Sequence, residues 1–73
     1  MTTFGNRLYE LRKSHGLTMK QLASWADMHL SHISDIENER SYPSLVTCQR
    51  IARAFDISLS ELFEGVEVEE IAK

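Results

Sequence analysis

His29, His32 and Asp35 are spaced so that they could coordinate a metal ion. The histidines are three residues apart and the aspartate follows three residues later, which would place all three along one side of a helix. A structural zinc site needs four protein ligands, and no fourth ligand is evident in the sequence. Histidines that face solvent or phosphate are far commoner. We therefore predict no metal and no cofactor.

Other reactive side chains give no support for catalysis. The 73 residues contain no serine, histidine and acid set with motif spacing and no glycine-rich phosphate loop. The single cysteine, Cys48, cannot form an intrachain disulfide, which is typical of a reducing compartment. It shares a helical stripe with Leu45, Ile51 and Ala52, so we expect an inert thiol in the core. We predict that the chain is not an enzyme.

Charge is distributed unevenly along the chain. The formal net charge is −3, but residues 1–55 hold seven basic and five acidic side chains, whereas residues 56–73 hold one and six. Residues 1–55 thus form a weakly basic body that permits DNA binding. We predict one domain over residues 1–65 and an acidic tail over residues 66–73. Charged residues near the N-terminus leave no apolar stretch for a signal peptide or membrane span, so we expect a cytoplasmic protein with no membrane partner.

Caps and apolar spacing predict an all-α fold of five short helices. Thr18 with Gln21, and Ser58 with Glu61, have the spacing of a capping box. Apolar residues recur at helical intervals between the caps. The expected helices run from Phe4 to the break at 14–16, from Thr18 through Ala26, from His29 or Leu30 to the polar stretch 38–41, from Ser44 through Phe55, and from Ser58 to Gly65.

The second and third of these helices are joined by only two or three residues. Small Ala23 lies where their axes would approach, and Ile33 and Ile36 would pack beneath. So tight a junction prevents antiparallel stacking and leaves the third helix exposed on the body. This arrangement is a helix-turn-helix, formed by the second and third helices.

The motifs of this region resemble a known family. LTMKQLASWADMHLSHISDIE, followed by YPSL and IARAFDISLSELF, is similar to the DNA-binding domain of phage repressors and Cro proteins, the XRE family. The resemblance covers roughly residues 4–64. It implies a compact five-helix, repressor-like domain that binds an operator in double-stranded DNA.

Three positions depart from the family's pattern. Met19 stands where the family often has a glutamine that resembles a phosphate anchor. Asp27 stands where the family usually has glycine in the inter-helix turn; aspartate tolerates the left-handed conformation at a cost of about 1 kcal/mol. His29 replaces a small hydroxyl cap at the start of the third helix. Because histidine ranks poorly as a cap, Ser31 is an alternative that would shorten this helix by two residues.

Helical geometry then indicates which side chains face outward. With Ile33 and Ile36 inward, Ser31 and Asp35 point away from the body. The resemblance implies that these positions read bases, with Leu30 suited to a thymine methyl and Asp35 to the cytosine N4 amine. The predicted base-reading residues are Leu30, Ser31, Ser34 and Asp35. The predicted phosphate contacts are Lys20, Gln21, His32, Asn38, Arg40, Ser41 and Tyr42.

The resemblance also implies a structural ion pair, between Arg12 and Glu37, that joins the first helix to the third. A single module of this kind has too little interface for useful specificity, so we expect a homodimer on a palindromic operator. Its dimer surface is expected in an apolar cluster near the C-terminus: Ile57, Leu59, Leu62, Phe63 and Val66.

The sequence thus favours a sequence-specific transcriptional regulator, a repressor, with no evident small-molecule effector. Two alternatives stay open. One is an antitoxin or a restriction-modification controller built on the same domain. The other is a protein-interaction module that has kept the fold and lost DNA binding, which the acidic tail would suit.

Overall fold

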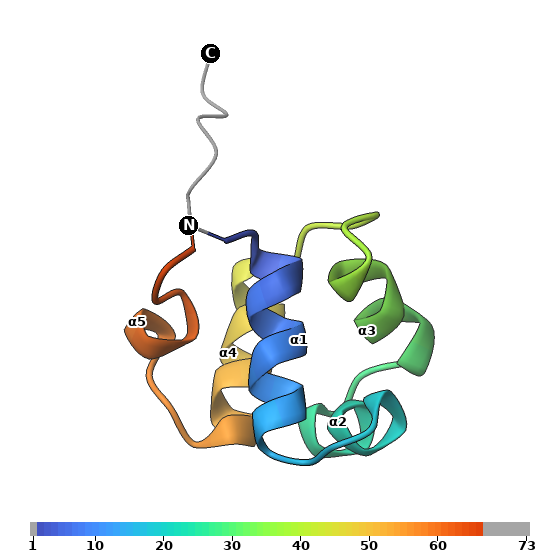
Figure 1. The fold of residues 1–73 in the computed structure, drawn as a ribbon. Coiled ribbons are helices and arrows are strands. Elements are labelled where there is room, and N and C mark those ends of the chain that lie inside the picture. Colours follow the sequence, from blue (N-terminus) through green and yellow to red (C-terminus); the bar gives the residue numbers. More distant parts are fainter. Residues whose placement is uncertain (1, 67–73) are drawn as a thin grey trace.

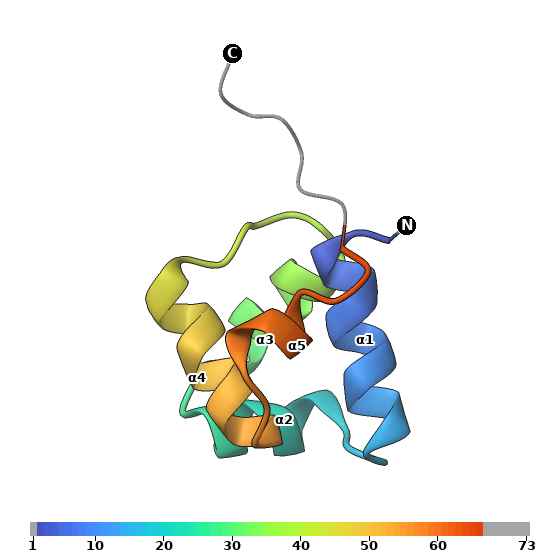
Figure 2. The same cartoon turned by 90° about the vertical axis from the view of Figure 1, so that its left-hand side faces the viewer.

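The computed structural model describes residues 2–66, which form five α-helices. The all-α, five-helix fold is confirmed. α3 and α5 lie on opposite sides of the molecule in Figure 1, and α2 closes its lower end in both Figure 1 and Figure 2. α1 contacts α3, α2 contacts α3 and α4, and α4 contacts α5. The helices are α1 (Phe4–Ser14), α2 (Met19–Ala26), α3 (Leu30–Glu37), α4 (Leu45–Phe55) and α5 (Leu59–Leu62).

Side-chain caps explain where four of the helices begin. In each, a hydroxyl oxygen accepts a hydrogen bond from the backbone N–H three residues later, which satisfies a donor that the helix leaves unpaired. Both predicted capping boxes are formed. The capping residues are Thr3, Thr18, Ser44 and Ser58.

The start of α3 differs from the other four. Its N-cap is His29, whose side chain makes no capping hydrogen bond. The backbone of His29 is extended, and its carbonyl accepts from the N–H groups of His32 and Ile33. The alternative in which Ser31 caps the helix is therefore wrong, because the backbone alone sets the start at Leu30.

The turn between α2 and α3 is built on Asp27. Its φ of 57° and ψ of 52° lie in the left-handed region, as the family resemblance implies. Arg50 of α4 donates a hydrogen bond to the Asp27 carbonyl at 3.0 Å. The turn that sets the angle between α2 and α3 is thereby attached to the rest of the body.

All five helices contribute to one hydrophobic core. Cys48 is buried as predicted, and burial raises the pKa of its thiol and keeps it protonated. The expectation that Leu45 shares its buried stripe is wrong, because Leu45 is 65% exposed and the buried face of α4 begins one turn later. The core comprises Phe4, Leu8, Leu17, Leu22, Ala23, Ile33, Ile36, Cys48, Ile51, Ala52, Phe55 and Leu62.

The two ends of the described chain meet. Thr2 and Val66 form a parallel β-bridge, and the Thr2 N–H donates to the Gly65 carbonyl at 3.0 Å. Of the predicted acidic tail, only Val66 is described, and residues 67–73 lie outside the described residues. Between residues 2 and 66, no helix has the length and apolar character needed to cross a membrane.

Candidate nucleic-acid interface

Arg12 of α1 and Glu37 of α3 form a bidentate ion pair beneath the exposed helix. Arg12 Nε donates to Glu37 Oε2 at 2.6 Å, and Nη2 donates to Oε1 at 3.0 Å. The Arg12 and Glu37 side chains are only 8% and 4% exposed. The remaining terminal nitrogen, Nη1, donates to the Leu17 carbonyl at 2.9 Å. Hydrogen bonding to Glu37 raises the pKa of Arg12, so its guanidinium stays charged well into the alkaline range.

Gly5 allows the first turn of α1 to lie directly against the end of α3. A Cβ atom built at this position would lie 2.5 Å from the Ile36 carbonyl oxygen and 3.0 Å from that of Glu37. Both neighbours are backbone atoms of α3, which cannot rotate away. Sequence reasoning missed this residue, whose only signal is a glycine inside a helix, where alanine would be the better helix former.

A third contact joins Thr3, the N-cap of α1, to Glu39, which lies two residues after α3. The Thr3 hydroxyl donates to Glu39 Oε2 at 2.7 Å while accepting from the Asn6 N–H. Glu39 has a φ of 61°, in the region that favours glycine. With Gly5 and the Arg12–Glu37 pair, this contact fixes the C-terminal end of α3 on α1.

An open groove borders the outer side of α3. One wall is formed by the first half of α3, and the other by the end of α1 and the start of α2. Two lysines from the second wall, Lys13 and Lys20, are exposed. Lys13 was not among the predicted phosphate contacts. It follows Arg12 in α1, and its proximity to α3 becomes visible only in the folded chain. The lining residues are Arg12, Lys13, Leu17, Thr18, Met19, Lys20, Leu30, Ser31 and Ser34.

The structure brings the predicted base-reading residues onto one side of α3. Leu30 is 48% exposed, and Ser31 beside it is also exposed. Ser34 and Asp35 are half-buried. Three of the four line the groove, whereas Asp35 lies farther along the helix and pairs with Arg40, its Oδ1 accepting from Arg40 Nε at 3.1 Å. We call this side of α3 the reading face.

Two of the predicted phosphate contacts already have hydrogen-bond partners within the chain. Gln21 uses its side-chain carbonyl in the capping box of α2. Asn38 donates its amide to the Ser34 carbonyl at 2.8 Å. Lys20 is exposed in the groove wall, whereas His32 is half-buried. Within residues 2–66, no three His, Cys, Asp or Glu side chains gather closely enough to hold a metal ion.

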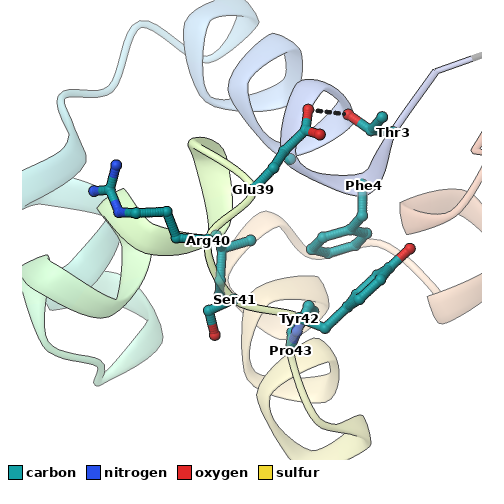
Figure 3. Close-up of a pocket in the computed structure, with 9 residues that line it drawn as sticks. Thr3, Phe4, Glu39, Arg40, Ser41, Tyr42 and Pro43 are labelled. Atoms are coloured by element: carbon teal, nitrogen blue, oxygen red, sulfur yellow. Dashed lines mark hydrogen bonds between the residues drawn. The ribbon is translucent and has the colours of Figure 1, made fainter.

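The remaining predicted phosphate contacts, Arg40, Ser41 and Tyr42, follow α3. They border a second hollow, of about 330 Å³, between the start of α1 and residues 39–43. In Figure 3, Tyr42 lies beside the ring of Phe4, whereas Arg40 extends in another direction, away from both rings. Tyr42 is 66% exposed and Ser41 is half-buried. Tyr42 therefore faces the hollow beside Phe4, whereas Arg40 points away from it.

The predicted dimer surface requires one correction. Leu62 is 0% exposed and belongs to the core of the single chain, because the only full turn of α5 faces inward at this residue. Phe63 is half-buried, and its ring centroid lies 5.0 Å from that of Phe4. The other members of the cluster also pack against the core while remaining partly exposed: Ile57, Leu59 and Val66.

Comparison with known proteins identifies the family. A model described as "Helix-turn-helix" matches residues 8–62, from the second turn of α1 to the end of α5. The chain belongs to the XRE-type helix-turn-helix family. The family match includes the whole α2–turn–α3 unit, so the predicted helix-turn-helix is confirmed.

Relatives of this helix-turn-helix chain include regulators of different lengths. It is 43% identical over 61 residues to the HTH-type transcriptional regulator DdrOP3 of Deinococcus deserti, covering 84% of this chain and 47% of that protein. The chain thus spans about half the length of DdrOP3. It is 39% identical over 67 residues to the control protein C.MunI of Mycoplasma sp, covering 90% of each.

A solved structure shares the fold of this family member. The crystal structure of the restriction-modification controller protein C.AhdI from Aeromonas hydrophila matches with a TM-score of 0.79 and 38% identity. The match covers 82% of this chain and 91% of that one. The chain is therefore a DNA-binding regulator by family, with a repressor-type helix-turn-helix fold.

Proposed function

We propose that this DNA-binding regulator represses transcription as a homodimer on a palindromic operator, with α3 in the major groove. The observation that carries the proposal is the reading face, which is exposed beside two lysines and fixed at its far end on α1. A rigid helix with an accessible polar face suits base recognition, because a major groove admits one α-helix. The role is binding without catalysis, in the compartment that holds the DNA.

The residues divide into two roles in this proposal. Leu30, Ser31 and Ser34 reach base edges, the leucine through a thymine methyl group and the serines through hydrogen bonds. Lys13 and Lys20 bind phosphates on the near side of the groove, since lysine acts as a point charge toward phosphate. Affinity then comes mainly from the lysines, and sequence preference mainly from α3.

Removing either lysine should weaken binding equally for preferred and random duplexes. We expect Lys13→Ala and Lys20→Ala each to reduce the slope of log affinity against log salt by about one unit. The measurement is fluorescence anisotropy with labelled duplexes over a range of salt concentrations. Arg53→Ala is the matched control, because Arg53 is exposed on α4 and does not line the groove. Unchanged slopes in both lysine variants would contradict the proposed phosphate contacts.

Dimerisation is proposed because one module buries too little surface for specific binding on its own. The partly exposed apolar residues around α5 provide the surface: Ile57, Leu59, Phe63 and Val66. A two-fold axis there would place the two reading faces in successive turns of the major groove.

Leu59→Glu should convert the dimer into a folded monomer that binds only half-sites and binds them weakly. A carboxylate at the centre of an apolar interface would lose its hydration without gaining a partner. Sedimentation equilibrium measures the mass, and a thermal melt checks the fold. The control is Val46→Glu, which places the same charge on an exposed apolar position of α4. A dimeric Leu59→Glu variant would place the interface elsewhere, and a monomeric parent protein would favour the protein-interaction module.

Control of a restriction-modification system is a second candidate for the biological role. It is favoured by the matches to C.MunI and C.AhdI, each of which extends over nine-tenths of the relative's length. Genes for an endonuclease and a methyltransferase beside the coding sequence would support this role. Their absence would leave general transcriptional repression.

A further inference from the structure

The end of α3 brings Arg40 back beside Asp35. The Glu39 N–H donates to the Ile36 carbonyl at 3.0 Å, and the Arg40 N–H donates to the Asp35 carbonyl at 2.8 Å. Together with the left-handed φ of Glu39, these are the paired hydrogen bonds of a Schellman motif. In that motif the side chains of the two outer residues lie close together, usually as a hydrophobic contact. Here those residues are an arginine and an aspartate.

The resulting ion pair leaves most of the guanidinium available. Arg40 Nε donates to Asp35 Oδ1 at 3.1 Å, and the two side chains are 61% and 44% exposed. Within residues 2–66, neither terminal nitrogen of Arg40 has a hydrogen-bond partner. Figure 3 shows the side chain extended away from the hollow that contains Phe4 and Tyr42. Both terminal nitrogens of this exposed side chain therefore keep their N–H donors unused within the described residues.

Asp35 lies one helical turn after Ser31, at the far end of the reading face. Arg40, its ion-pair partner, places a positive charge on this face, although α3 itself contains no lysine or arginine. Two parallel N–H donors match the O6 and N7 acceptors of guanine, which is the commonest specific contact in the major groove. A guanidinium already held by a carboxylate has less freedom to lose on binding.

We propose that Asp35 and Arg40 act as one reading unit, in which Arg40 binds the edge of a guanine and Asp35 is the positioning residue that holds it. The inference rests on the proposed function, because it requires the reading face to enter the major groove. It adds Arg40 as a base-reading residue and reassigns Asp35 from direct contact with cytosine. It also explains how an aspartate is tolerated near phosphates, since its charge is balanced by Arg40.

The test measures base preference in variants of both residues. A preferred duplex is first selected from random sequences with the parent protein, and every base pair in it is then changed singly. Asp35→Ala and Arg40→Gln should each reduce discrimination at the same G·C pair by about 5- to 150-fold. The double variant should lose little more than either single variant, because the two residues act through one contact.

Two further variants separate this role from a purely electrostatic one. Arg40→Lys keeps the charge and removes the planar fork, so it should lose the guanine preference as Arg40→Gln does. Arg53→Gln is the matched control, because Arg53 is another exposed arginine, lies on α4 and does not line the groove. It should leave preference at every base pair unchanged.

Three results would contradict the inference, and each leads to a different conclusion about the reading face. Equal weakening on all duplexes by Arg40→Gln, with a salt slope reduced by about one unit, would make Arg40 a phosphate contact and leave the proposed function standing. Loss of preference in Asp35→Ala with preference retained in both Arg40 variants would make Asp35 the direct reader. Absence of any sequence preference in the parent protein would overturn the proposed function itself.

Discussion

Glu37→Ala should lower the free energy of unfolding by about 3 to 5 kcal/mol. The substitution leaves the guanidinium of Arg12 charged in a place where its side chain is only 8% exposed. Of its three hydrogen bonds, only the one to the Leu17 carbonyl would remain. For a small domain this is a large share of the total stability. Urea denaturation monitored by circular dichroism measures the loss.

A double-mutant cycle shows whether this loss belongs to the pair. Arg12→Met with Glu37→Leu removes both charges and keeps apolar volume, so the double variant should be more stable than either single variant. Glu64→Ala is the control, because its contact with Arg7 spans 4.0 Å and the Glu64 side chain is 78% exposed. We expect that control to change stability by less than about 1 kcal/mol. Additive losses in the cycle would mean that Arg12 and Glu37 stabilise the fold independently.

Gly5→Ala should lower the free energy of unfolding by about 1 to 3 kcal/mol. The new methyl group would meet the Ile36 carbonyl oxygen at 2.5 Å, so α1 and α3 must move apart. The loss is expected although alanine favours a helix over glycine by about 1 kcal/mol. Thermal or urea unfolding measures stability, and hydrogen exchange of the α3 amides reports the displacement of the reading helix.

Ser24→Ala provides the matched control for the added helix propensity. Ser24 is exposed on α2 and its side chain makes no hydrogen bond within residues 2–66, so its replacement should change stability by no more than about 0.5 kcal/mol. A Gly5→Ala variant that is as stable as the parent, with unchanged hydrogen exchange in α3, would contradict this prediction. It would show that stability does not require the close approach of α1 to the α3 carbonyls.

Local signals in the sequence were sufficient for most of the fold. The hydroxyl residues before α2 and α5 define their starts, because a cap depends only on neighbours three residues away. The left-handed conformation of Asp27 was expected from family resemblance, because Asp27 stands where the family usually has glycine and aspartate tolerates this conformation. The pairing of Arg12 with Glu37 came from family resemblance, because no local rule joins residues 25 positions apart.

Features that depend on how elements meet could not be predicted in the same way. Gly5 looks like an ordinary helix position until the carbonyls of α3 are placed beside it. Arg40 reaches Asp35 only because Glu39 adopts a positive φ, for which glutamate gives no sequence signal. The assignment of Leu62 to the dimer surface is wrong because α5 packs this side chain into the core of the single chain.

The bridge between Thr2 and Val66 determines how this domain can be combined with others. Both ends of the described chain emerge at one pole, whereas α2 lies at the opposite pole (Figure 1). A second module attached before Thr2 or after Val66 would start from the same place and leave the groove beside α3 open. Two copies could likewise be joined by a linker from Val66 of one copy to Thr2 of the next. Pairing of the two domains would then be intramolecular and would no longer depend on protein concentration.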